Sequence, residues 1–322
     1  MQPLEFHPIL KQIRWGGRRL GTFLGKPIGN AADYAESWEI VDHGDDQSIV
    51  TSGSFEAWPL KKMVAQHGRE LFGKHAGLTQ FPLLVKFLDA TDLLSLQVHP
   101  NDLQARGVDP DENGKSEAWV ILDAEPESKL FVGLKNGVDR RGLTKSLEEG
   151  TVEDCLYSFT VSPGDCVYIP AGTVHAIGAG ILLAEIQQSS DLTYRLYDWG
   201  RVGTDGKPRP LHISEALACV DFGRGPVDPV VPKSLAGDNG SIEELVRSDY
   251  FVMRRHSTVD PFVLEVGDCF RVLMPLEGSG VLRCGDDRRE LKLGRTILLP
   301  AAAPAVEIVP SETMVLLETF LP

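Results

Sequence analysis

Short strand-like runs separated by turn residues fill the chain from residue 81 to 200. Gly, Pro, Asp and Asn stand between the runs, a spacing that is typical of an antiparallel all-β barrel or jelly roll. Helix-like periodicity is confined to flanking segments, at residues 57–72, 139–154 and 213–220. The sequence therefore predicts a mainly β fold with a few flanking helices.

One of these runs, residues 93–100, carries polar side chains on a single face. Because side chains alternate between the two faces of a strand, Ser95, Gln97 and His99 point to one side and the apolar residues between them to the other. Gln97 and His99 can both direct an oxygen or nitrogen atom at one point. This pattern indicates half of a metal site.

Two other segments could supply the second half of that site. Glu117 follows a turn and begins a strand-like run. His175 follows a Pro-Ala-Gly turn that lies between two short apolar runs. Each residue thus stands at the beginning of an expected strand.

These segments resemble the type I phosphomannose isomerases, which are zinc-dependent cupin enzymes that interconvert mannose 6-phosphate and fructose 6-phosphate. The resemblance spans nearly two thirds of the chain. It rests on residues 15–17, 36–39, 81–89, 95–102, 114–119, 169–176 and 185–195.

The resemblance implies that Gln97, His99, Glu117 and His175 are the metal ligands. The residue types agree with this, because nitrogen and oxygen ligands without a thiolate suit zinc and leave room for water or substrate. Such a site also accepts manganese, iron or cobalt. The ligands therefore indicate that a metal ion is bound more firmly than they indicate which metal it is.

The resemblance also makes Arg195 catalytic. Its planar cation could hold the enediolate oxygens from the side opposite the metal. From the residues alone, a surface arginine paired with Asp191 or Asp198 is the plainer interpretation. Glu185 interrupts an apolar run, where an unpaired acid is costly, and is a candidate proton carrier, with a metal-bound water as the competing base.

A phosphate dianion needs a local patch of positive charge in this chain, because 46 acidic residues outnumber 32 basic ones and the net charge is −14. Lys115 and Ser95 each precede an expected ligand by two residues, and the resemblance makes both positions substrate contacts. Lys115, Lys86, Arg195 and Arg201 could form the patch. Lys86 could equally be paired inside the protein.

Composition narrows the other possibilities. The chain has no Lys-rich or Arg-rich tract, which argues against nucleic-acid binding. It has no leader-like beginning and no apolar stretch near the roughly 18 residues of a membrane span, so we expect a cytoplasmic protein without membrane contact. Five cysteines without a C-x-x-C pair argue against a disulfide framework or a thiolate zinc site.

The chain is expected to have two parts. Residues 1–222 would form a catalytic cupin domain, residues 223–240 are a linker rich in Gly, Pro and Asp, and residues 241–322 would form a second, degenerate cupin barrel. Residues 291–300 overlay residues 161–170 without a gap, and in that register His175 corresponds to Ala305. The second barrel would therefore lack metal ligands. Homo-oligomer formation is possible.

We therefore predict a metal-dependent aldose–ketose isomerase that acts on a sugar phosphate through an enediol. Two alternatives stay open: a sugar-binding or sensor cupin without turnover, and a cupin dioxygenase. The sensor would not need Arg195, Lys115 and Glu185 around its metal. The dioxygenase is less compatible with a glutamine ligand and a phosphate patch.

Overall fold

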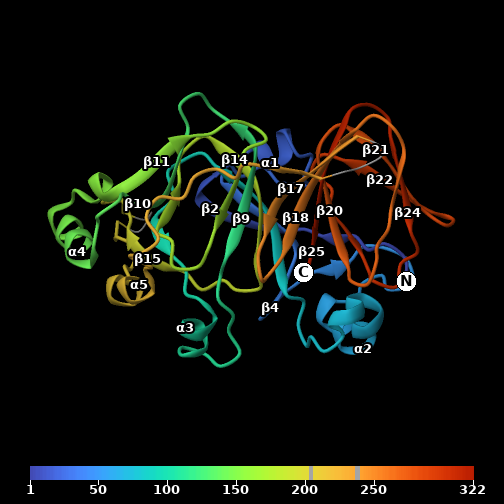
Figure 1. Ribbon diagram of the computed structural model, residues 1–322, viewed down its shortest axis with the longest axis horizontal. Helices are drawn as coiled ribbons and strands as arrows, with labels where there is room; N and C mark the ends of the chain where they lie inside the picture. The colour runs from blue at the N-terminus through green and yellow to red at the C-terminus, as the bar shows by residue number, and fades with distance from the viewer. Residues whose placement is uncertain (203–205, 236–239) are drawn as a thin grey trace.

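The computed structural model describes residues 1–202, 206–235 and 240–322. Antiparallel β-sheets make up most of this part of the chain, and the helices are short and few (Figure 1). The mainly β fold with a few helices is confirmed. Within the described ranges, no helix is both long and apolar enough to cross a membrane.

Two sheets form the first half of the chain. The six-stranded sheet has the order β12 (Cys166–Ile169), β9 (Glu117–Ala124), β14 (Ile181–Gln188), β7 (Leu83–Ala90), β3 (Tyr34–Ile40) and β2 (Ile9–Gly17). The five-stranded sheet has the order β11 (Leu156–Thr160), β10 (Lys129–Leu134), β13 (His175–Ile177), β8 (Leu96–Val98) and β15 (Tyr194–Tyr197).

Two further sheets form the second half. The six-stranded one has the order β16 (Lys233–Leu235), β17 (Ser241–Arg247), β18 (Val252–Thr258), β25 (Met314–Phe320), β20 (Arg271–Glu277) and β23 (Ile297–Leu299). The four-stranded one has the order β19 (Phe262–Leu264), β24 (Val306–Pro310), β21 (Ser279–Cys284) and β22 (Asp287–Lys292). Small pairs join β1 (Phe6–His7) to β6 (Ile49–Val50) and β4 (Asp42–His43) to β5 (Asp46–Gln47).

The two halves share one strand order. The run β12-β9-β14-β7 in the first half has the counterpart β23-β20-β25-β18 in the second, and β11-β10-β13-β8 has the counterpart β22-β21-β24-β19. The overlay of residues 161–170 on 291–300 places β12 on β23, in agreement with this order. The same chain path is thus used twice.

Strand register extends this correspondence to single residues. Ile169 of β12 pairs with Glu117, and its counterpart Leu299 of β23 pairs with Arg271, so Arg271 occupies the position of Glu117. By the same register Glu318 of β25 occupies the position of Glu185 of β14. In the second half, therefore, a cation at the start of β20 replaces the carboxylate at the start of β9.

The predicted helices form, with boundaries that local chemistry explains. Helix α5 (Ile213–Cys219) lies as predicted, whereas α2 (Leu60–Phe72) begins later than residue 57. Pro59 caps α2 and disfavours helix before it, and Ala57 has a left-handed backbone with φ 62°. The helix expected at 139–154 is interrupted, because α4 (Arg140–Glu149) ends at left-handed Gly150 before the 3-10 helix η2 (Val152–Cys155).

Three short helices were not predicted. They are α1 (Arg19–Thr22), α3 (Asp102–Arg106) and the 3-10 helix η1 (Gly73–His75). Each is too short to show a helical period in the sequence.

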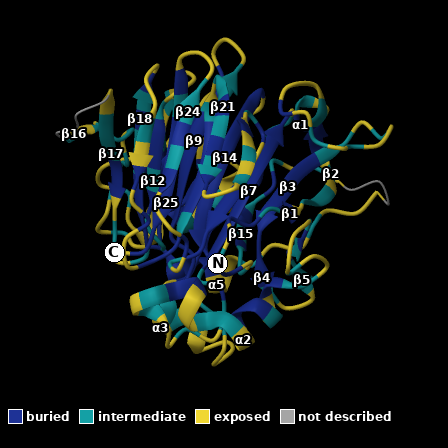
Figure 2. Cartoon of the chain, turned by 90° about the vertical axis from the view of Figure 1, so that its right-hand side faces the viewer, coloured by how far each residue is buried: buried dark blue, intermediate teal, exposed yellow. Residues whose placement is uncertain are grey.

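The two halves pack into one continuous core. Phe270 of the second half contacts Phe81 and Phe72 of the first, with ring centroids 4.9 and 6.1 Å apart. Helix α2 lies beneath the orange and red second half in Figure 1, and the amide of Ala301 donates to the carbonyl of Leu71. Figure 2 shows the buried strands in the middle of the molecule, with exposed loops at their ends and partly exposed helices below them.

The segment expected to be a linker also packs against the first half. The amide of Val230 donates to the carbonyl of Cys166 at 2.7 Å, and residues 233–235 form strand β16. Residues 236–239 of this segment lie outside the described residues. The described part of residues 223–240 is therefore not a free tether.

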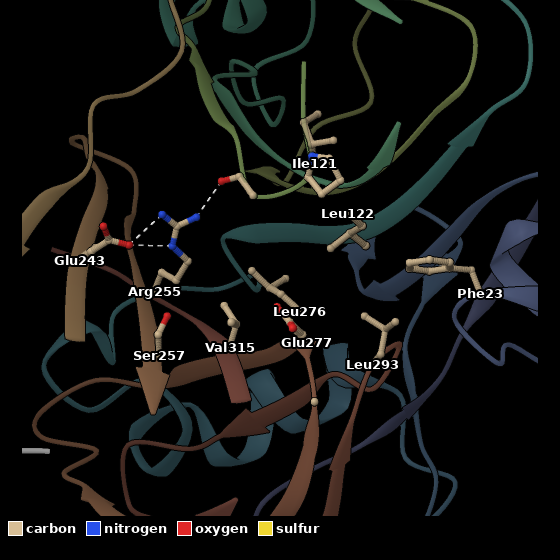
Figure 3. A pocket seen from close by; sticks show the side chains of 13 residues that line it. Phe23, Ile121, Leu122, Glu243, Arg255, Ser257, Leu276, Glu277, Leu293 and Val315 are labelled. Atoms are coloured by element: carbon tan, nitrogen blue, oxygen red, sulfur yellow. Dashed lines mark hydrogen bonds and ion pairs between the residues drawn. The ribbon is translucent and has the colours of Figure 1, made fainter. Parts of the chain in front are cut away.

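A cleft of about 540 Å³ lies where the two halves meet. Figure 3 shows Arg255 of β18 at one end of it, held by Glu243 and donating from Nη1 to the carbonyl of Gly164 at 2.7 Å. Most of the other lining side chains are apolar, among them Phe23 and Leu122, and Ser257 and Glu277 are the polar ones. Arg255 thus ties the second half to a turn of the first.

Replacement of the fully buried Phe270 tests this shared core. We expect Phe270→Ala to lower the free energy of unfolding by about 3–5 kcal/mol, because it leaves a cavity between the halves. Urea unfolding would measure the change. As the control, Val231→Ala, at a side chain 89% exposed, should change it by less than about 0.5 kcal/mol. Equal, small effects of both variants would show that the core does not span the halves.

Candidate metal centre

The three strongest ligand candidates converge at one buried point. His99 directly follows β8, while Glu117 and His175 are the first residues of β9 and β13. One ligating atom from each lies within 4.8 Å of the other two. All three side chains are at most 1% exposed, so strand ends from both sheets bring these residues together.

Both imidazoles are oriented by backbone carbonyls. Nδ1 of His99 donates to the carbonyl of Leu192, and Nδ1 of His175 to that of Thr173, each at 2.9 Å. Burial is the main cause that lowers the pKa of both histidines, which favours the neutral form. Their Nε2 atoms lie 3.5 and 3.3 Å from the oxygens of Glu117. In the neutral form each Nε2 carries a lone pair that can bind a metal ion.

Gln97, the fourth expected ligand, lies next to His175. It pairs with His175 across β8 and β13, and its amide lies 3.2 Å from Nε2 of that histidine. An amide can present either its oxygen or its nitrogen by rotation about the last side-chain bond. Two imidazoles, one carboxylate and one amide oxygen fit zinc or a similar divalent ion.

The ammonium of Lys115 lies among these groups. Its Nζ is 3.1 Å from Nε2 of His99 and contacts a carboxylate oxygen of Glu117. Burial alone would raise the pKa of Glu117, but nearby groups, the charge of Lys115 first among them, outweigh burial and lower that pKa. Glu117 is thus an anion with positive charge beside it.

A row of alternating buried charges continues from this point across the six-stranded sheet. Lys115 lies 3.5 Å from Glu185, which lies 3.3 Å from Lys86, which in turn lies 3.4 Å from Glu36. Burial is the main cause that raises the pKa of Glu185. Lys86 is therefore paired inside the protein, which was the alternative interpretation of that residue.

A cavity of about 300 Å³ opens onto these charges. Most of the residues that the sequence singled out line it, namely Lys86, Ser95, Gln97, Lys115, Glu117, Glu185 and Arg195. The sequence interpretation missed Glu36, Trp119 and Arg209 of the lining. His99 and His175 are not among the residues that line it.

Strand pairing of its backbone and one hydrogen bond of its side chain hold Arg195 at this cavity. It pairs with Gln97 across β15 and β8, and its Nη1 donates to the carbonyl of Pro210 at 2.9 Å. Its Nε is buried without a hydrogen-bond partner. Burial and then the nearby charge of Arg209 lower the pKa of Arg195. Among the described residues it forms no ion pair with Asp191 or Asp198.

The structure places Arg201 outside the cavity lining and Arg209 within it. Arg201 and Arg209 share one carboxylate, because Nη2 of Arg201 lies 2.6 Å from Oδ1 of Asp198 and Nε of Arg209 donates to its Oδ2 at 2.7 Å. In the sequence, Arg209 could have been singled out by its position between Pro208 and Pro210, because two prolines restrict the backbone on both sides of it.

The Asp198 carboxylate gives a pH-dependent contribution to stability. Burial would raise its pKa, but hydrogen bonds from Arg209 and Arg201 outweigh burial and lower the pKa below its ordinary 3.8. The stabilisation is complete above that value and is lost as the pH falls through the lower folded-state pKa. Wild type should therefore melt at a higher temperature than Asp198→Asn at about pH 6, with a difference that shrinks below about pH 4. A difference that stays constant to about pH 3 would contradict the ion-pair assignment.

Comparison with known proteins gives one consistent result. Residues 4–128 match the family model for the phosphomannose isomerase type I catalytic domain. The mannose-6-phosphate isomerase ManA of Bacillus subtilis (strain 168) is 36% identical over 304 residues, 93% of each chain, and that of Streptococcus mutans is 32% identical over 93% of this chain and 92% of its own. The crystal structure of a mannose 6-phosphate isomerase from Bacillus subtilis superimposes with a TM-score of 0.91 at 30% identity and 99% coverage of both chains. The chain therefore belongs to the type I phosphomannose isomerases.

Proposed function

We propose that this protein interconverts mannose 6-phosphate and fructose 6-phosphate with one divalent cation per chain, held by Gln97, His99, Glu117 and His175. The observation that carries the proposal is the convergence of two neutral imidazoles and a carboxylate on one buried point. Zinc is the ion that we propose first, because it favours four ligands of this kind.

The bound cation would supply Lewis-acid polarisation of the carbonyl and hydroxyl oxygens of the sugar. The protein must also move one proton from C2 to C1 through the enediol, while a second proton passes from the C2 hydroxyl to O1. Glu185 fits this role, because burial raises its pKa and makes its carboxylate a stronger base. Its carboxylate would take the C2 proton and return it to C1.

Lys115 and Arg195 are proposed to stabilise charge on the substrate oxygens. Both line the cavity, together with Ser95. A second cation at His99 and Glu117 would repel the ammonium of Lys115 from its present place, which frees it to donate to the O1 and O2 atoms of the enediolate. The permanent charge of Arg195 would act on the same oxygens from the side of β15.

The phosphate is proposed to bind near Arg195 and Arg209. The charge of Arg209 lies close enough to lower the pKa of Arg195, and two adjacent cations suit a dianion. Arg201, which the sequence suggested for this role, would instead hold Asp198 and through it orient Arg209. Lys86 would act through Glu185 rather than by touching the phosphate.

The shared strand order supports two cupin-type barrels, with the catalytic one in residues 1–222, the connection in 223–240 and the second in 241–322. The second barrel would hold no metal, because two ligand positions are changed in it. Arg271 corresponds to Glu117 of the first barrel and Ala305 corresponds to His175. We further propose a cytoplasmic enzyme. Homo-oligomer formation through an edge strand is also part of the proposal.

A coupled assay for fructose 6-phosphate tests the proposal. Activity should be lost after EDTA and restored by zinc, manganese or cobalt.

His175→Ala should lose metal and activity together, because it removes a ligand. Arg195→Ala should keep the metal and lose turnover by a factor on the order of 10² or more.

Two results would count against these roles. Full activity in the thoroughly chelated protein would reject the metal site. Nearly normal turnover in Arg195→Ala would reject a catalytic role for that residue while leaving the metal site intact.

A further inference from the structure

Tyr250, which lies between β17 and β18, reaches from the second half of the chain to the first. Its hydroxyl donates a hydrogen bond of 3.2 Å to Oδ2 of Asp102 in α3. The turn that carries it is fixed by Ser248, whose Oγ accepts from the amides of Tyr250 and Phe251. Burial, and then the charge of Asp102, raises the pKa of Tyr250 to about 12, so its hydroxyl stays protonated at neutral pH.

The other oxygen of Asp102 holds the backbone that leads into β9. Oδ1 accepts from the amide of Gly114 at 2.8 Å and from Nε2 of Gln188 at 2.9 Å. Gln188 in turn accepts from the amide of Ser116 at 2.9 Å through its Oε1. A single carboxylate therefore holds two points of this backbone, one directly and one through Gln188.

The same backbone has little room to shift. The amide of Lys115 donates to the carbonyl of Pro100 at 3.0 Å. A Cβ atom on Gly114 would lie only 2.5 Å from the amide nitrogen of Asp102, so the two chain segments are in closest contact here. Glu117 follows Gly114 by three residues. A displacement of Asp102 therefore shifts the backbone of residues 114–117 and, with it, the carboxylate of Glu117.

We infer that Tyr250 is a positioning residue for the candidate metal centre and acts through Asp102 on residues 114–117. The inference rests on the proposed function, because it takes Glu117 to be a metal ligand. Groups that orient metal ligands from behind typically change metal affinity or activity by about 10- to 100-fold when they are lost. By this contact the second half of the chain sets the position of a ligand in the first half.

Direct metal titration of Tyr250→Phe tests the inference. Chelated full-length protein is titrated with Zn²⁺ alone, and with Co²⁺ to record the visible spectrum of the bound ion. We expect weaker Zn²⁺ binding, on the order of tenfold, and a changed Co²⁺ spectrum, because the carboxylate of Glu117 is less well placed. A merely structural role would lower the melting temperature and leave affinity and spectrum unchanged.

Tyr157→Phe is the matched control. Tyr157 also donates its hydroxyl to an aspartate, Asp228, but it lies on edge strand β11, which β10 and β13 separate from β8. This variant should bind Zn²⁺ as wild type does. Equal affinity and equal spectra in Tyr250→Phe and Tyr157→Phe would overturn the inference. If wild type binds Zn²⁺ no better than His175→Ala does, the metal-site proposal itself fails, which is a separate result.

A second pair of variants covers the case in which Tyr250→Phe does not fold. Asp102→Ala should weaken Zn²⁺ binding on the order of tenfold or more. Asp102→Asn should restore most of the affinity, since it keeps an oxygen for Gly114 and Gln188 and an amide that can donate to Tyr250. Wild-type affinity in Asp102→Ala would overturn the inference.

Discussion

Glu117 is a carboxylate at the start of a buried strand, and its charge must be balanced inside the protein because its side chain is only 1% exposed. Its neighbours are the ammonium of Lys115 and the imidazoles of His99 and His175. Two neutral imidazoles cannot neutralise an anion, so one cation is needed at this point. Lys115 meets that need in the present structure, and a divalent ion would meet it more fully while leaving Lys115 available for substrate.

The second half of the chain shows another solution to the same constraint. Arg271, at the position of Glu117, lies 3.0 Å from Glu318, at the position of Glu185. Here guanidinium and carboxylate balance each other, and the protein alone supplies both charges. The same strand order thus carries a carboxylate that can bind a metal ion in one half and an internal ion pair in the other. The shared core around Phe270 holds the two halves together.

The sequence predicted what depends on local periodicity and missed what depends on distant contacts. Alternation along residues 95–99 correctly placed Gln97 and His99 on one face, and the structure brings His99, Glu117 and His175 together, while their role as ligands stays a prediction. Arg209 was missed because its loop has no period. The contact of Tyr250 with Asp102 joins residues 148 positions apart, for which one sequence carries no signal.

One divalent cation should occupy the point where His99, Glu117 and His175 converge. A crystal structure of the zinc-loaded protein, with anomalous diffraction recorded at the zinc edge, tests this most directly. We expect one strong anomalous peak per chain, about 2.0–2.1 Å from both Nε2 atoms, with the ammonium of Lys115 withdrawn from Glu117. A peak elsewhere, or Lys115 still seated on Glu117 with no peak between the imidazoles, would contradict it.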